Sequence, residues 1–80
     1  MKKNKIIELV GWYGVVAILA AYMLLSFGFI ASNSLIYQIL NGTGALGIVF
    51  DALKDKNYQP AVLNTIWALV AIFALFKILI

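Results

Sequence analysis

The sequence contains no cysteine, no histidine and no arginine, and it holds one proline in 80 residues. Without cysteine there is no disulfide and no thiol chemistry. Without histidine the commonest metal ligand and general base is missing. No Asp, Glu, Lys or Arg occurs between Leu9 and Phe50. We therefore expect no metal site, no cofactor and no catalytic residues, and we predict that the protein is not an enzyme.

The uncharged stretch from Leu9 to Phe50 decides the class of protein. As one helix it would run roughly 63 Å at about 1.5 Å per residue, which is about twice the roughly 30 Å hydrocarbon core of a bilayer. The chain must therefore turn inside it, and residues 31–34, Ala-Ser-Asn-Ser, favour turns and caps. A second uncharged run, from Asn57 to Phe76, is long enough for a third crossing. The sequence predicts an all-α integral membrane protein, a small helical bundle of three transmembrane helices.

The composition agrees with this class, because 65% hydrophobic and 11% charged residues leave too little polar surface for a soluble domain. Ser34 suits the N-cap of the second helix. Pro60 suits the first turn of the third helix, where its missing N–H would have no partner in any case. We predict a single membrane domain over residues 1–80, with helices at about 7–30, 34–53 and 60–80.

The lysines predict the orientation in the membrane. The net charge of +3 comes from six lysines and three acids. Five lysines, at positions 2, 3, 5, 54 and 56, fall before the first crossing or between the second and third, which is the same side. Only Lys77 lies on the other side. The positive-inside rule then places the N-terminus in the cytoplasm and the C-terminus outside. Lysines that flank apolar spans favour anionic lipid headgroups, so we expect the lipid bilayer as a partner and no nucleic acid.

Polar side chains within the first two spans are predicted to face each other. Counting outward from the tip of the first hairpin, Tyr22 lies level with Asn41 and Ser26 lies level with Gln38. An amide or phenol left unpaired in hydrocarbon costs several kcal/mol. We therefore expect two polar rungs between these helices, which either hold the helices together or line a cavity.

Asn64 and Trp67 form a second candidate. Counting from the second loop, Asn64 lies level with Gly47, and Trp67 lies level with Gly44. Trp67 is too deep for an interfacial belt, so its indole N–H needs an internal partner. Two glycines opposite these side chains would leave a notch, either filled by them or open. An open notch would be a small-molecule site with an aromatic wall and convergent amides.

Four short motifs stand out in the sequence: GWxG from Gly11, AYxL from Ala21, SxxYQxLNxxGA from Ser34 and PAVLNxxWA from Pro60. Together they resemble those of a family of small bacterial three-helix membrane proteins of unknown function. The resemblance implies a multi-pass protein of the bacterial inner (plasma) membrane, and it brings no established activity. A more distant likeness is to the SemiSWEET half-transporters, three-helix proteins that dimerise around a sugar path. That likeness implies that Asn64 matches their substrate-contacting asparagine.

These observations favour a homo-oligomer, with a dimer preferred, because three helices alone do not readily enclose a path and two copies supply six. We predict a small-solute transporter or binding protein. The alternative is a structural or regulatory subunit of a larger membrane complex, which binds another membrane protein through faces of small residues. The candidate cavity or interhelical polar residues are Tyr22, Ser26, Gln38, Asn41, Gly44, Gly47, Asn64 and Trp67.

Overall fold

The described residues form three α-helices. A computed structural model describes residues 5–80; Lys2 and Lys3, which contribute to the predicted orientation, lie outside the described residues. The helices are α1 (Lys5–Ser26), α2 (Leu35–Lys54) and α3 (Tyr58–Leu79). Each is long and apolar enough to cross a membrane. The prediction of an all-α protein with three candidate membrane spans is therefore confirmed.

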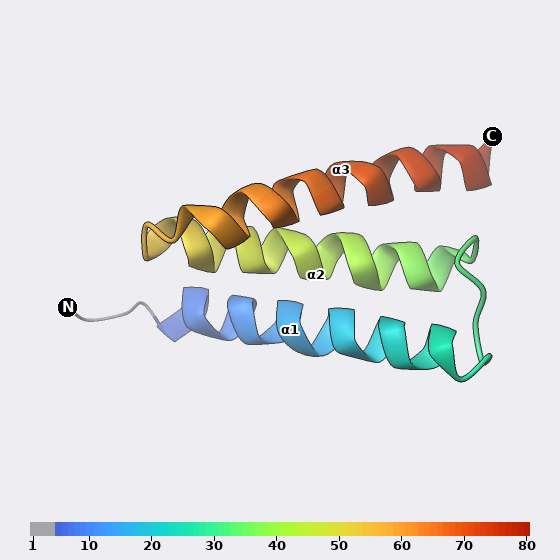
Figure 1. The fold of residues 1–80 in the computed structure, drawn as a ribbon, viewed down its shortest axis with the longest axis horizontal. Helices are drawn as coiled ribbons and strands as arrows, with labels where there is room; N and C mark the ends of the chain where they lie inside the picture. Colours follow the sequence, from blue (N-terminus) through green and yellow to red (C-terminus); the bar gives the residue numbers. More distant parts are fainter. Residues whose placement is uncertain (1–4) are drawn as a thin grey trace.

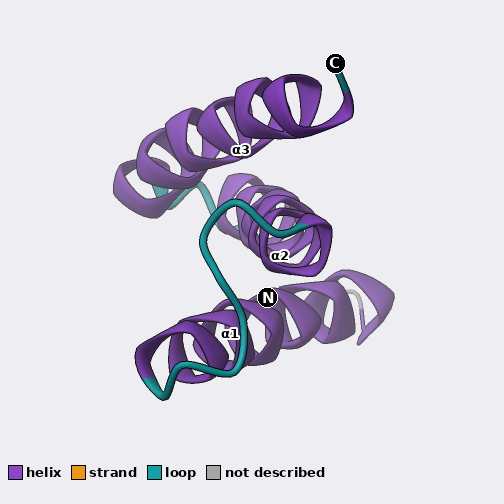
Figure 2. Ribbon diagram, turned by 90° about the vertical axis from the view of Figure 1, so that its right-hand side faces the viewer, coloured by secondary structure: helices purple, strands orange, loops and turns teal. Residues whose placement is uncertain are grey.

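The helices lie side by side in one layer with α2 in the middle (Figure 1). The view along the helices in Figure 2 shows α1 and α3 on opposite sides of α2. Both pack on α2, and within the described part of the chain α1 and α3 have no Cα atoms within 8 Å of each other. The fold is thus an open layer, whereas the sequence predicted a bundle.

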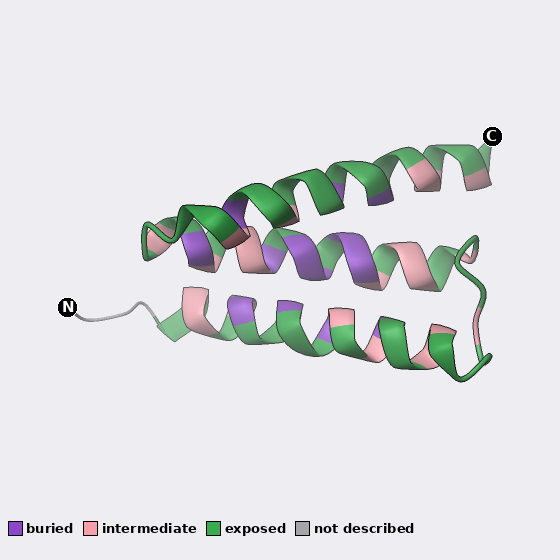
Figure 3. Cartoon of the chain, viewed as in Figure 1, coloured by how far each residue is buried: buried purple, intermediate pink, exposed green. Residues whose placement is uncertain are grey.

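The layer follows from where the small residues lie on α2. Every buried residue in the described chain is glycine, alanine or Asn41, and these residues follow the helix contacts (Figure 3). Gly44 faces α1, and Gly42 faces Ala71 of α3. These two glycines are two residues apart, which is about 200° around a helix. Because close packing is available on two opposite sides of α2, its neighbours do not need to meet each other.

Helix α1 ends at Ser26, four residues before the predicted end at Ile30. Gly28 has a φ of +82°, in the left-handed region that favours glycine. Its N–H donates to the carbonyl of Leu25 at 3.1 Å, and the N–H of Phe29 donates to the carbonyl of Leu24 at 2.9 Å. This pair of bonds is the Schellman motif, which terminates a helix. The predicted boundary was wrong because Gly28 stops the helix.

Helix α2 is capped at both ends. Ser34 is its N-cap, as predicted, and the Ser34 hydroxyl accepts the N–H of Tyr37 at 3.2 Å. At the other end, the N–H of Asn57 donates to the carbonyl of Ala52 at 2.8 Å, and the N–H of Lys56 donates to that of Leu53 at 3.0 Å. This is a second Schellman motif, with Lys56 at a φ of 56°. A lysine therefore occupies the position that usually holds glycine.

Replacing Lys56 with glycine is expected to stabilise the protein by about 0.5–1 kcal/mol, because glycine adopts the left-handed region without a Cβ penalty. The measurement is the free energy of unfolding in mixed micelles. Lys56→Ala is the control, since it removes the same charge and keeps the Cβ. A gain of equal size in Lys56→Ala would attribute the effect to charge and contradict the backbone explanation.

Helix α3 begins at Tyr58, two residues before the predicted start. Pro60 is therefore its third residue and still lies in the first turn. Backbone N–H groups there have no intrahelical acceptor, so the missing N–H of proline costs no hydrogen bond. Asn57 precedes the helix without a side-chain capping bond. A proline thus limits where a helix begins to within one turn and does not fix its first residue.

Candidate functional site

The structure places the eight predicted site residues in separate environments. Tyr22 is 63% exposed, and Ser26 is exposed as well. The face of α1 that packs on α2 consists of small residues, and Ala21 is fully buried there. Tyr22 follows Ala21 by one residue and so points about 100° away from this face. The two predicted rungs between α1 and α2 are not formed by these residues, which corrects the prediction.

Gln38 bonds to the preceding turn. Its Nε2 donates to the backbone carbonyl of Ser32 at 2.8 Å. This bond ties the start of α2 to the α1–α2 turn. Gln38 therefore fixes a loop, and Ser26 is not its partner.

Gly44 and Gly47 face α1, so they do not form a notch beside Asn64 and Trp67. A Cβ on Gly44 would lie 2.9 Å from the carbonyl oxygen of Gly14, and one on Gly47 would lie 2.6 Å from that of Val10. A Cβ on Gly14 would in turn overlap the carbonyl oxygen of Gly44. We call Gly14, Gly44 and Gly47 the glycine seam. The backbone of α1 fills the space in which the sequence predicted a notch.

The same seam continues toward the Lys5 end of α1. A Cβ on Gly11 would lie 2.7 Å from both the Cβ and the Oδ2 of Asp51. Asp51 thus packs directly over a glycine of α1. Trp12 and Glu8 lie beside it around a cavity of about 300 Å³. Close approach of α1 and α2 therefore extends along most of their shared length.

Asn41 and Trp67 form the main polar contact between α2 and α3. The indole Nε1 of Trp67 donates to Oδ1 of Asn41 at 3.1 Å. Asn41 is 8% exposed and is the buried polar side chain of the described residues, whereas Trp67 is 45% exposed. Trp67 thus has the internal partner that its depth requires. The amide oxygen of Asn41 is thus already bonded within this chain, and the Asn41–Trp67 pair is a packing contact between α2 and α3.

Asn64 is satisfied within its own helix. Its Nδ2 donates to the carbonyl of Pro60, one turn earlier, at 2.9 Å. Thr65 behaves in the same way, donating to the carbonyl of Ala61 at 2.7 Å. The usual helical partner of the Pro60 carbonyl is the backbone N–H of Asn64, so the Asn64 side chain adds a second donor to that carbonyl. The structure therefore does not bring Asn64 together with Gly47.

A second bond between helices, which the sequence did not predict, joins Tyr13 of α1 to Thr43 of α2. Their hydroxyl oxygens lie 2.7 Å apart. The Thr43 hydroxyl also bonds the carbonyl of Ile39 at 2.6 Å, and a carbonyl only accepts. Thr43 therefore uses its single hydrogen on Ile39, and Tyr13 donates to Thr43. Tyr13 falls in the first half of α1, where an aromatic residue can also be interfacial, so its residue type alone did not point to this bond.

One side of α2 is covered by neither neighbour. Thr43 lies two residues, and so about 200°, from the buried Asn41. From Ile36 to Leu53 the exposed residues of α2 recur at alternating spacings of three and four. Alternation of three and four is the heptad spacing that faces a partner helix in a coiled coil. We call this set the α2 stripe; it consists of Ile36, Ile39, Thr43, Leu46, Phe50 and Leu53.

A small apolar cavity lies next to the α2 stripe, between α2 and α3. Its volume is about 110 Å³. It is lined by the stripe residues Ile39, Thr43 and Leu46 and, on α3, by small and aliphatic residues such as Ala68 and Ile72. A side chain from a second helix packed on the stripe would meet this hollow. The uncovered side of α2 therefore combines apolar residues at heptad spacing with a small cavity beside them.

Replacing Trp67 with phenylalanine is expected to lower the free energy of unfolding by about 1 kcal/mol, because interhelical hydrogen bonds in membranes contribute roughly 0.6–2 kcal/mol. The matched control is Trp12→Phe, at an indole that is 61% exposed. Unfolding in mixed micelles measures both variants. Equal losses in the two would show that the bond to Asn41 contributes nothing specific.

Comparison with known proteins adds one match. Residues 7–80 match the model of one protein family. No curated protein and no solved structure matches the chain. A function for this chain therefore has to rest on its geometry.

Proposed function

We propose that this chain, which belongs to the family matched over residues 7–80, is a homodimeric multi-pass protein of the bacterial inner membrane. Three helices that are long and apolar enough to span a membrane support the location. The observation that carries the dimer is the α2 stripe. In an isologous dimer the same surface of both copies forms the interface, so the stripe of one copy would pack against the stripe of the other.

Two copies with the same orientation in the membrane would pack their α2 helices in parallel. Heptad spacing suits the left-handed crossing of about 20° that most transmembrane bundles adopt. Thr43 lies near the middle of the α2 stripe. A polar residue at the interface of two coiled helices fixes how they align along their length. The large apolar side chains of the stripe would then interlock, and Leu46 would lie beside the small cavity of the partner.

We propose that the dimer binds a small solute, without catalysis, around the paired hydroxyls of Tyr13 and Thr43. Two copies would bring two such pairs to one place near the middle of the spans, where transporters built from repeats hold their substrates. The residues first expected to serve this purpose are used otherwise, since Asn64 bonds Pro60 and Trp67 bonds Asn41.

A second candidate function is a structural or regulatory subunit of a larger membrane complex. It is favoured by the internal bonding of the polar side chains, which leaves the apolar α2 stripe as the main uncovered feature of the central helix. In that case a helix of another membrane protein would occupy the stripe. Helix association in membranes relies on packing of this kind.

The mass of the purified protein in nanodiscs separates the two candidates. We expect the mass of two chains for the wild type alone. A solute that binds the dimer is expected to raise its unfolding temperature by mass action, which a thermal-shift screen detects. A single-chain mass at every protein concentration would reject the homodimer. Recovery of one stoichiometric partner through the stripe would favour the subunit.

The proposed orientation predicts which cysteines can be labelled from outside the cell. With the N-terminus in the cytoplasm, the α1–α2 turn faces outward and the α2–α3 loop faces inward. A membrane-impermeant thiol reagent is expected to label Asn33→Cys in intact cells and Asp55→Cys only after permeabilisation. The absence of native cysteine keeps the background low. The reverse pattern would invert the topology.

A further inference from the structure

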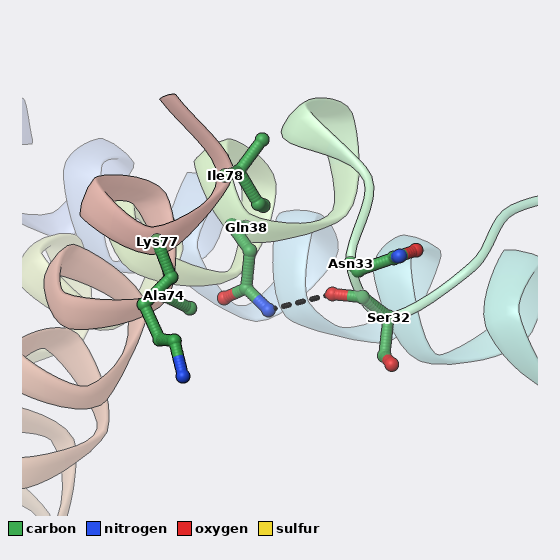
Figure 4. A pocket seen from close by; sticks show the side chains of 6 residues that line it. All are labelled: Ser32, Asn33, Gln38, Ala74, Lys77 and Ile78. Carbon is green, nitrogen blue, oxygen red and sulfur yellow. Dashed lines mark hydrogen bonds between the residues drawn. The ribbon is translucent and has the colours of Figure 1, made fainter. Parts of the chain in front are cut away.

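A cavity with polar side chains in its lining lies at the end of the layer where α3 finishes and the α1–α2 turn passes. Its volume is about 480 Å³, within the usual range for ligand sites. Its lining consists of Ser32, Asn33, Gln38, Ala74, Lys77 and Ile78. The turn and the last turns of α3 are far apart in sequence, and Figure 4 shows their side chains around one opening.

Three hydrogen-bond donors gather on this opening. The bond from Gln38 to the Ser32 carbonyl, 2.8 Å long, holds the turn against α2. In Figure 4 the Lys77 ammonium and the Ser32 hydroxyl extend to the same side, with the Gln38 amide between them. An amide nitrogen carries two hydrogens, so Gln38 keeps one donor after bonding Ser32. The arrangement offers an ammonium, a hydroxyl and an amide N–H to one ligand.

The side chains that line this cavity carry charge of one sign. Lys77 is the charged residue among those that line the cavity. The side-chain carboxylates of Asp51 and Asp55 lie at the opposite end of α2, and Glu8 lies near the start of α1, also at that far end. A cation with a hydroxyl and an amide, and no acidic side chain in the lining, favours an oxyanion.

We propose that this cavity binds a phosphate group, with Lys77, Ser32 and Gln38 as its donors. The group belongs either to the headgroup of an anionic lipid or to free phosphate. Lipid headgroups are found at the ends of membrane-spanning helices, where a lysine near the surface attracts anionic lipid. The site lies within one chain, so it does not depend on whether the protein dimerises.

The test follows the backbone amide NMR signals of Ser32, Asn33 and Gln38 in phosphatidylcholine nanodiscs. One arm adds phosphatidylglycerol to the bilayer, and the other adds inorganic phosphate to the buffer. Saturable shifts with phosphatidylglycerol alone support the site with a lipid headgroup as its ligand. Saturable shifts with inorganic phosphate support the site with free phosphate. The absence of saturable shifts in both arms overturns the proposal.

Variants then locate the binding group. We expect Lys77→Gln to weaken binding about fivefold and Lys77→Arg to retain it, because arginine also donates to phosphate. Ser32→Ala is expected to weaken binding by a smaller factor. The matched control is Lys54→Gln, at the other end of the layer, which should leave the affinity unchanged. If Lys54→Gln weakened binding as much as Lys77→Gln, the attraction would be a general property of the charged surface and the proposal would fail.

Discussion

Replacing Gly14 with alanine is expected to destabilise the packing of α1 on α2 by about 1–3 kcal/mol. The new Cβ would overlap the carbonyl oxygen of Gly44. A backbone atom cannot rotate away, so relief requires the two helices to separate. Gly47→Ala is expected to act in the same way, since its Cβ would lie 2.6 Å from the carbonyl oxygen of Val10. Both losses are measured as free energies of unfolding in mixed micelles.

Gly42→Ala is the matched control for the glycine seam. It makes the same substitution on α2, and its Cβ would lie 3.1 Å from the side-chain Cβ of Ala71. A shift of a few tenths of an ångström relieves that contact, and alanine gains up to about 1 kcal/mol over glycine in helix propensity. We therefore expect a change close to zero in Gly42→Ala. Similar losses in Gly14→Ala and Gly42→Ala would contradict the role assigned to the seam.

Truncating two large side chains of the α2 stripe is expected to separate the dimer. In the double variant Leu46→Ala, Phe50→Ala, a symmetric dimer loses four interlocking side chains at once. Packing is the main source of helix association in lipid. We expect dimerisation about a hundredfold weaker, which corresponds to roughly 2.8 kcal/mol. Energy transfer between labelled copies, measured over a range of protein-to-lipid ratios, gives the change.

The control for the stripe removes the same apolar volume from another exposed surface. Leu69 and Phe73 of α3 are 60% and 66% exposed. The double variant Leu69→Ala, Phe73→Ala is expected to dimerise like the wild type. Equal weakening by both pairs would mean that the stripe has no special role, and unchanged association in the stripe variant would move the interface elsewhere.

The number and length of the helices could be predicted from the sequence because charge is so scarce. Two uncharged runs, one about twice the length of a membrane span, fit three crossings and few other arrangements. The N-cap at Ser34 could be predicted because serine is a preferred N-cap residue. The end of α1 was not readable, because Gly28 stands inside an apolar run. A glycine there suits both close helix packing and a left-handed helix end, and only the backbone geometry tells them apart.

The candidate site was predicted in part. Counting residues from the loops gave approximate depths, but depth does not say which neighbour a residue faces. Gly44 and Gly47 contact α1, although counting from the second loop placed them level with residues of α3. The heptad spacing of the α2 stripe is present in the sequence. Most residues of α2 are apolar or small, however, so the spacing is recognised only once the exposed residues of α2 are distinguished from the buried ones.

Disulfide cross-linking between copies tests the α2 stripe most directly, since the chain has no cysteine of its own. Single substitutions Ile39→Cys and Leu46→Cys place thiols on the stripe, and Leu69→Cys places one on the exposed face of α3. Mild oxidation of native membranes is expected to yield covalent dimers from the two stripe positions and none from Leu69→Cys. Efficient cross-linking through Leu69→Cys, with none through Ile39→Cys or Leu46→Cys, would contradict a dimer formed by α2.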